Sequence, residues 1–108
     1  MPTTSKVLEG VDLKSLRAGS LIDVQTESRH YHIECLGGDS IRISGHPEYC
    51  PNPVGARVQG SVDEDGNVDL SVIEPGMRLV FFLNHRPVTT SKIVRVEVNP
   101  PEALSIVA

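Results

Sequence analysis

The stretch MRLVFFLNHRPVTTSKIVRVEV, residues 77–98, decides the fold of this 108-residue chain. It holds both phenylalanines and the densest valine, isoleucine and leucine content, in two segments joined by a short polar turn. Because successive side chains of a strand point to opposite faces, one face of the first segment can point into a core. That face consists of Leu79, Phe81 and Leu83. We expect the stretch to form the central hairpin of an all-β core.

Val80 and Phe82 make the opposite face of the same segment apolar as well. A strand that is apolar on both faces has to be covered on both. The cover could come from elsewhere in the chain, or from a protein partner or a second copy in a homodimer. The sequence leaves these two alternatives open.

Composition also favours strands. Valine and isoleucine supply 21 residues against four alanines, and β-branched side chains pack well on a pleated sheet. Nine glycines and eight prolines interrupt the apolar runs, which is typical of a small barrel or sandwich. We predict an all-β, small single-domain antiparallel β-barrel or compact sandwich of roughly five to seven strands. Residues 1–10 are expected to be a flexible leader, 11–98 the β-barrel domain and 99–108 a C-terminal tail.

The alternation of apolar and polar residues predicts the remaining elements. A single helical or 3₁₀ turn is expected within residues 11–18. The predicted strands outside the central hairpin cover residues 20–26, 30–36, 41–43, 57–62 and 68–72. The residues expected to face inward are Leu13, Leu16, Ile22, Val24, Tyr31, Ile33, Cys35, Ile41, Ile43, Val58, Gly60, Val62, Val68, Leu70, Val72, Val94, Val96 and Val98. Asp23 and Gln25 are expected on an outward face.

Residues 60–98 also resemble a known barrel module. They contain a glycine turn, a short strand, the pattern I-x-P-G-M-x-L, a polar turn and V-x-V-E-V in that order. This order loosely resembles the barrel module of translation factors and related reductase domains, over about a third of the chain. The resemblance implies a small β-barrel fold and assigns no functional residue.

The net charge of −4 and the pI near 5.5 argue against nucleic acid as the partner, because phosphate neutralisation needs a concentrated basic surface. A nucleic-acid barrel would use Arg42, Arg57, Arg78 or Arg95. No apolar run has the length of a membrane span, and no secretion signal is recognisable. We therefore expect a soluble cytoplasmic protein without a membrane partner. Its two cysteines, Cys35 and Cys50, are expected to be reduced thiols.

The string His30-x-His32-x-Glu34 is the main candidate for chemistry. Strand periodicity places these three side chains on one face, where two imidazoles can hold one metal ion. His46 or His85 could supply a further ligand, and the ion would be zinc or another divalent transition metal. The alternative is a solvated polar face without a ligand.

The proline-rich loop of residues 45–55 is the second candidate, as a recognition surface. Its His46-x-x-x-Cys50 pair has no accompanying Cys-x-x-Cys, so it does not make a typical structural zinc site. The common catalytic and nucleotide-binding signatures are missing, which favours a protein that is not an enzyme. The leading hypothesis is a binding or protein-interaction module without a cofactor, and the alternative is a metal-binding protein or metalloenzyme with a His-x-His site.

Overall fold

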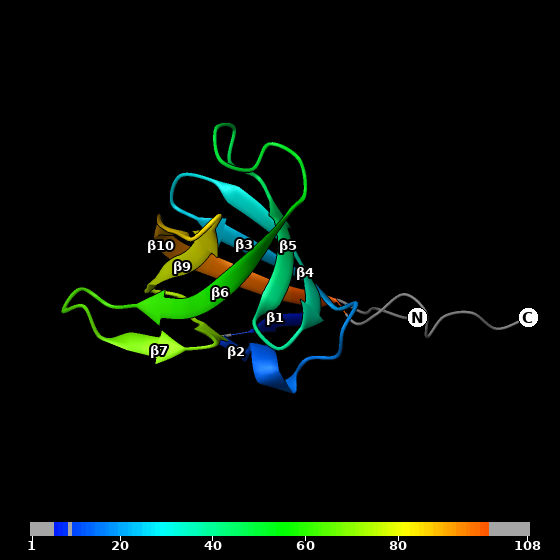
Figure 1. The fold of residues 1–108 in the computed structure, drawn as a ribbon. Helices are drawn as coiled ribbons and strands as arrows, with labels where there is room; N and C mark the ends of the chain where they lie inside the picture. Colours follow the sequence, from blue (N-terminus) through cyan, green and yellow to red (C-terminus); the bar gives the residue numbers. More distant parts are fainter. Residues whose placement is uncertain (1–5, 9, 100–108) are drawn as a thin grey trace, which may run out of the picture.

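The computed structural model describes residues 6–8 and 10–99, which form ten strands and one 3₁₀ turn (Figure 1). The first five strands are β1 (Lys6–Leu8), β2 (Val11–Asp12), β3 (Leu21–Thr26), β4 (His30–Gly37) and β5 (Ser40–Ser44). The others are β6 (Val54–Val62), β7 (Val68–Leu70), β8 (Val72–Ile73), β9 (Arg78–Leu83) and β10 (Arg86–Asn99). The 3₁₀ turn η1 covers Leu13–Ser15.

Six strands close into a ring. Strand β10 pairs with β3, and β3, β4, β5 and β6 follow one another as antiparallel neighbours. Strand β9 then pairs with β6 on one side and with β10 on the other, which completes the circuit. Strand β1 extends the sheet beyond β10, and β7 extends it beyond β6. The predicted antiparallel all-β fold is confirmed, and the closed ring makes it a barrel rather than a sandwich.

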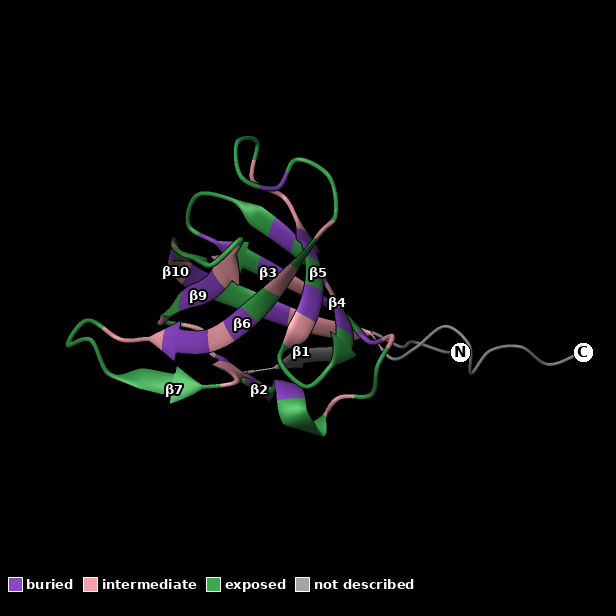
Figure 2. Ribbon diagram, viewed as in Figure 1, coloured by how far each residue is buried: buried purple, intermediate pink, exposed green. Residues whose placement is uncertain are grey.

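Burial alternates regularly along β3, β4 and β5 (Figure 2). In β4, Tyr31, Ile33 and Cys35 are buried, whereas His30 and His32, which alternate with them, are exposed. The inward residues predicted for β3 and β5 are likewise buried, namely Ile22, Val24, Ile41 and Ile43. These strands therefore have one core face and one solvent face, as their sequence predicts.

Strand β10 breaks this regularity because it serves two neighbours. Its first half pairs with β9 and its second half with β3, and the register shifts between Ile93 and Arg95. The shift turns Ile93 into the core at 1% exposure and leaves Val94 outside at 53%. The prediction that Val94 faces inward is wrong, because a β-bulge adds one residue to the period of two. Val96, beyond the bulge, is buried as predicted.

The prediction for β7 is also wrong. Val68 and Leu70 were expected to face inward, but they are 41% and 64% exposed. Among the described strands, β7 pairs with β6 alone, and it projects from the side of the barrel (Figures 1 and 2). Ser71, which follows, has a positive φ of 64°, and the next strand, β8, pairs with β2 and contributes the buried Ile73 instead.

The apolar segment of β9 lies at the centre of the core. Leu79 and Phe81 are fully buried, and the ring of Phe81 meets Tyr31 edge to face at 6.1 Å. Val80 on the other face is only 7% exposed, so the chain itself covers it. Phe82 is half-buried. Intrachain covering thus accounts for Val80, and association through the remaining surface of Phe82 stays a prediction.

The start of the described chain completes the barrel. Leu13 in η1 is 2% exposed and belongs to the core, as expected for the predicted 3₁₀ turn. Strand β1 lies within the segment predicted as a leader and pairs with β10. Residues 1–5, 9 and 100–108, which hold the rest of that leader and most of the predicted tail, lie outside the described residues. No helix among the residues in the structure is long and apolar enough to span a membrane.

Candidate metal centre

The β3–β4 hairpin sets the geometry of the candidate site. Its turn is fixed by Thr26, whose backbone N–H donates to the Arg29 carbonyl at 2.8 Å. The Thr26 hydroxyl oxygen accepts the backbone N–H groups of Arg29 and Ser28 at 3.0 and 3.3 Å. The Thr26 side chain is buried, so these bonds are shielded from water. The resulting register places Asp23 directly opposite His32.

Asp23, His30 and His32 converge on the outer face of this hairpin. His32 Nδ1 donates to Asp23 Oδ1 at 2.7 Å, because a carboxylate can only accept. His30 Nε2 lies 3.9 Å from the same oxygen, and the two imidazole centroids are 4.6 Å apart. One possible ligand atom from each residue lies within 4.8 Å of the others. Two imidazoles and one carboxylate therefore surround one point.

The spacing is close to that of a metal site. With bonds of about 2.0–2.1 Å, two ligand atoms on a tetrahedral zinc ion lie about 3.3 Å apart. The His32–Asp23 separation of 2.7 Å would have to widen and the His30–Asp23 separation of 3.9 Å to shorten. The side chains of His30, His32 and Asp23 are 53%, 61% and 33% exposed, so rotation can make these changes without moving the core. An ion would replace the proton that His32 now shares with Asp23.

The other predicted ligands lie outside this group. Glu34 forms an ion pair with Arg42, with 2.8 Å between Oε1 and Nη1. His46 Nδ1 accepts two backbone N–H groups of its own loop, at 3.0 and 3.2 Å. His85 has a positive φ of 67° and lies in the turn between β9 and β10. Within residues 6–8 and 10–99, Asp23, His30 and His32 form the one such group of three.

Asp23 is the residue that sequence analysis missed as a ligand. Its outward orientation was predicted from the alternation in β3, but its pairing with His32 was not. A signal for that pairing exists, because Asp23 and His32 are equidistant from the middle of the tight Glu27-Ser28 turn. In a hairpin, residues at equal distance from the turn face each other.

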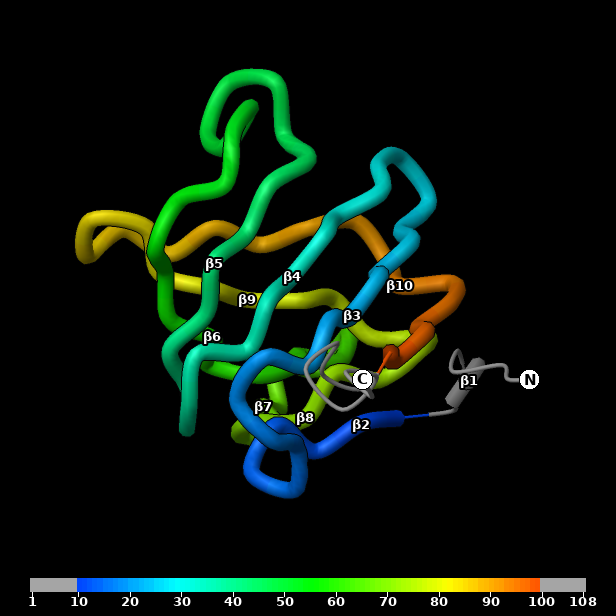
Figure 3. Tube along the Cα trace, turned by 90° about the vertical axis from the view of Figure 1, so that its right-hand side faces the viewer, coloured from blue at the N-terminus to red at the C-terminus, as the bar shows by residue number. Residues whose placement is uncertain are grey.

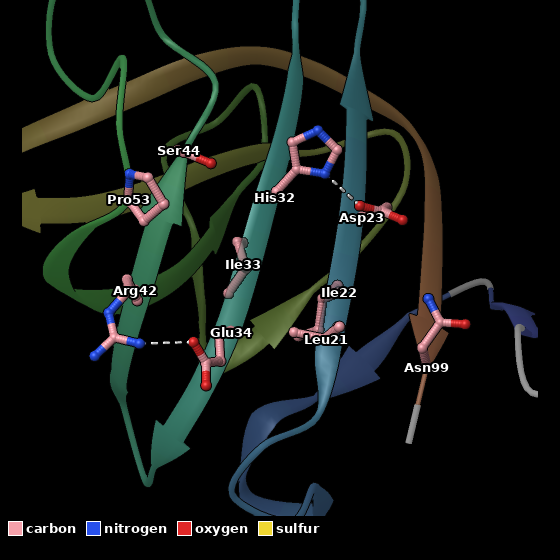
Figure 4. A pocket seen from close by; sticks show the side chains of 10 residues that line it. All are labelled: Leu21, Ile22, Asp23, His32, Ile33, Glu34, Arg42, Ser44, Pro53 and Asn99. Carbon is pink, nitrogen blue, oxygen red and sulfur yellow. Dashed lines mark hydrogen bonds and ion pairs between the residues drawn. The ribbon is translucent and has the colours of Figure 1, made fainter. Parts of the chain in front are cut away.

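A groove of about 530 Å³ adjoins the site on the outer face of β3, β4 and β5 (Figure 4). The His32–Asp23 pair lies at one end, and the Glu34–Arg42 pair lies apart from it (Figure 4). The other residues that line the groove are Leu21, Ile22, Ile33, Ser44, Pro53 and Asn99. Two of the three metal-ligand candidates thus also form the wall of a cavity.

The loop predicted as a recognition surface stands away from the ring (Figures 1 and 3). Tyr49 is 54% exposed, and its ring packs on His46 at a centroid distance of 4.5 Å. A second depression of about 540 Å³ lies between this loop and the β9–β10 hairpin. Its lining residues include Glu48, Tyr49 and Arg86.

Both cysteines are free and buried, in line with the prediction of reduced thiols. Burial and, to a smaller extent, the nearby Glu34 carboxylate together raise the pKa of Cys35 to about 11. The Cys35 side chain faces the core and lies outside the group formed by Asp23, His30 and His32. Cys50 is fully buried and closes the proline-rich loop through a backbone bridge with His46.

Three of the four arginines considered for nucleic-acid binding already have partners. Arg42 pairs with Glu34, and Arg95 lies 3.6 Å from a carboxylate oxygen of Glu97. Arg78 donates to the backbone carbonyl of Thr90 at 3.4 Å.

Comparison with protein-family models, with curated proteins and with solved structures found no match to this chain. The inference of function therefore rests on the geometry of its own residues.

Proposed function

We propose that this protein is a small β-barrel module that binds a divalent transition-metal ion through Asp23, His30 and His32. The observation that supports the proposal is the convergence of their ligand atoms within 4.8 Å on one exposed face. Imidazole nitrogen suits zinc, iron, nickel and copper, and the carboxylate adds the negative charge that a divalent ion prefers. Zinc is the reference ion for the tests because it has no redox chemistry.

The fold itself gains little from this polar group. An exposed ion pair of this kind contributes about 0.2–1 kcal/mol to stability, whereas a buried aromatic side chain contributes several times more. The three side chains also lie on the outer face, away from the core. Their arrangement can therefore be altered without loss of the barrel, so metal binding and folding can be measured separately.

Three protein ligands leave at least one coordination position for water or another ligand. A structural zinc site is usually closed by four protein ligands, so this arrangement supports a binding role rather than a role in holding the fold together. It is compatible with a binding module and with the metalloenzyme alternative, because both need an open position.

The direct test is calorimetric titration of the metal-stripped, untagged protein with Zn²⁺. We expect one ion per chain and an affinity at least about tenfold lower in His30→Ala, His32→Ala and Asp23→Asn, because even the loss of an outer partner costs that much. His85→Ala is the matched control, since this histidine lies in the β9–β10 turn outside the group. Absence of zinc binding, or an equal loss in His85→Ala, would refute the proposal.

Thermal unfolding supplies the second readout. Without metal, His32→Ala should unfold within about 1 kcal/mol of the wild type. Added Zn²⁺ should raise the Tm of the wild type more than that of His32→Ala, because the stabilisation of the folded state falls as the affinity for the ligand falls. A metal-free His32→Ala that is already unfolded would show that the side chain serves the fold.

A further inference from the structure

The groove beside the metal site is built from two rows of outward side chains. In the first row, Asp23 of β3 faces His32 of β4, and His32 faces Ser44 of β5. In the second row, Leu21 of β3 faces Glu34 of β4, and Glu34 faces Arg42 of β5. Residues two positions apart on a strand are about 6.5–7 Å apart, so one small molecule can contact both rows at once.

An ion held by Asp23 and His32 would lie at one end of this groove. Asp23 and His32 are candidate ligands, and both also line the cavity (Figure 4). A donor atom on a molecule in the groove could therefore complete the coordination of the ion. The volume of about 530 Å³ lies within the range of small-molecule sites.

Charge determines which molecules the groove accepts. Its lining contains two carboxylates, Asp23 and Glu34, against the single guanidinium of Arg42, which leaves one net negative charge. A divalent ion reverses this to one net positive charge. Glu97, which faces Asp23 from β10, does not change the balance because Arg95 pairs with it. The metal-free groove thus repels an anion, whereas the metal-loaded groove attracts one.

The second row gives the groove an apolar part. Leu21 is 47% exposed although it is a large aliphatic side chain, and Pro53 lies in the same lining. An apolar body placed against Leu21 would cover surface that water now contacts. Arg42, in the same row, offers N–H donors to the far end of a bound molecule.

Building on the proposed function, we infer that the groove binds a small organic monoanion whose carboxylate coordinates the metal ion and whose apolar body packs on Leu21. Binding depends on the metal ion, since the ion supplies both the coordination position and the net positive charge. The ligand is defined by this chemistry, a compact carboxylate with an apolar body.

Benzoate and benzamide are matched probes, because they share the ring and differ in charge. Protein loaded with one equivalent of Zn²⁺ and protein kept metal-free are each titrated by NMR. We expect benzoate to bind the zinc-loaded protein at least tenfold more tightly than the metal-free protein, and at least tenfold more tightly than benzamide binds.

Leu21→Ala and Leu70→Ala provide the residue-level test, because both leucines are well exposed and only Leu21 lines the groove. Leu21→Ala should lower benzoate affinity by about threefold or more and leave zinc affinity unchanged, while Leu70→Ala should change neither. A loss in both variants, or in neither, would overturn the assignment of the groove.

The two proposals fail in different ways. If zinc does not bind, both the proposed metal site and the proposed binding of a carboxylate in the groove are refuted. If zinc binds but benzoate and benzamide bind equally, or benzoate binds equally without zinc, only the groove inference is refuted.

Discussion

The two halves of the barrel differ in how strictly they keep strand geometry. The β3–β4 pair runs without a register shift, and its side chains alternate between core and solvent. The β4–β5 pair shifts only at its turn end, between Cys35 and Gly37. The β6–β9 and β9–β10 pairs each contain a shift, and so does the pairing of β10 with β3. Bulges bend strands and increase their twist, which is what a six-strand ring needs in order to close.

This difference separates two roles. The regular hairpin presents polar side chains in straight rows on its outer face, which makes it the better support for a site. The bulged strands carry Phe81, the largest side chain that is fully buried, and complete the ring. Three substitutions, in order of decreasing effect, test how far this separation holds.

The largest effect is expected in the bulged half. Phe81→Ala should lower the free energy of unfolding by about 3–5 kcal/mol, because it removes a fully buried ring that packs on Tyr31. Phe82→Ala is the matched control, since the neighbouring ring is only half-buried. Urea denaturation measures both. Equal losses would mean that the two faces of β9 contribute alike to the core.

The second test concerns the bulge in β6. Gly60 has a φ of 147°, and a Cβ there would collide with the backbone carbonyl of Asp69 on β7. Gly66 also has a positive φ, 88°, but a Cβ would meet nothing within 4 Å. Each change to alanine strains the backbone by roughly 1–3 kcal/mol, and Gly60→Ala should exceed Gly66→Ala by at least about 1 kcal/mol.

Thermal and urea unfolding of the two glycine variants give the comparison. A cost at Gly60 no greater than at Gly66 would show that β7 moves away freely and that the bulge does not hold it.

The smallest expected effect is a difference in pH dependence above pH 8, and it concerns the interior of the regular half. Burial raises the pKa of Cys35 to about 11 from its usual value of 9.0, so the folded state holds the thiol proton more tightly than the unfolded chain. Its contribution to stability is therefore complete below pH 9 and is lost as the pH rises through about 11.

Urea unfolding between pH 8 and pH 11 should thus show a steeper loss of stability in the wild type than in Cys35→Ala. Tyr31, whose pKa is also raised by burial, is present in both proteins, so the difference between them isolates the thiol. Parallel curves would mean that water reaches Cys35.

The regular half could be predicted from sequence because burial there follows from local alternation alone. In HYHIEC, each apolar residue faces inward and each polar one outward, and no distant contact alters this pattern. Val94 and Leu70 could not be placed in the same way. The bulge beside Val94 exists because β10 changes partners, and Leu70 is exposed because β7 lies at an edge. Both features depend on how the strands pair in the folded sheet, which the local sequence pattern does not show.

The candidate site was predicted only in part for the same reason. His30 and His32 share a face by strand periodicity, but the third ligand comes from the neighbouring strand and depends on register. Glu34 lies on the same face of β4 as the two histidines, as a ligand would, but Arg42 lies opposite and forms an ion pair with it. A pattern within one strand cannot reveal the partner that competes for a side chain.

Strand β10 also determines when the protein can fold. The ring closes only when the last residues of this strand, up to Asn99, meet β3 near the start of the chain. Contacts between such distant segments form slowly, because the loop between them must first be ordered. During synthesis the barrel can therefore close only after β10 has left the ribosome, and until then the edges of β3 and β9 are open to wrong partners.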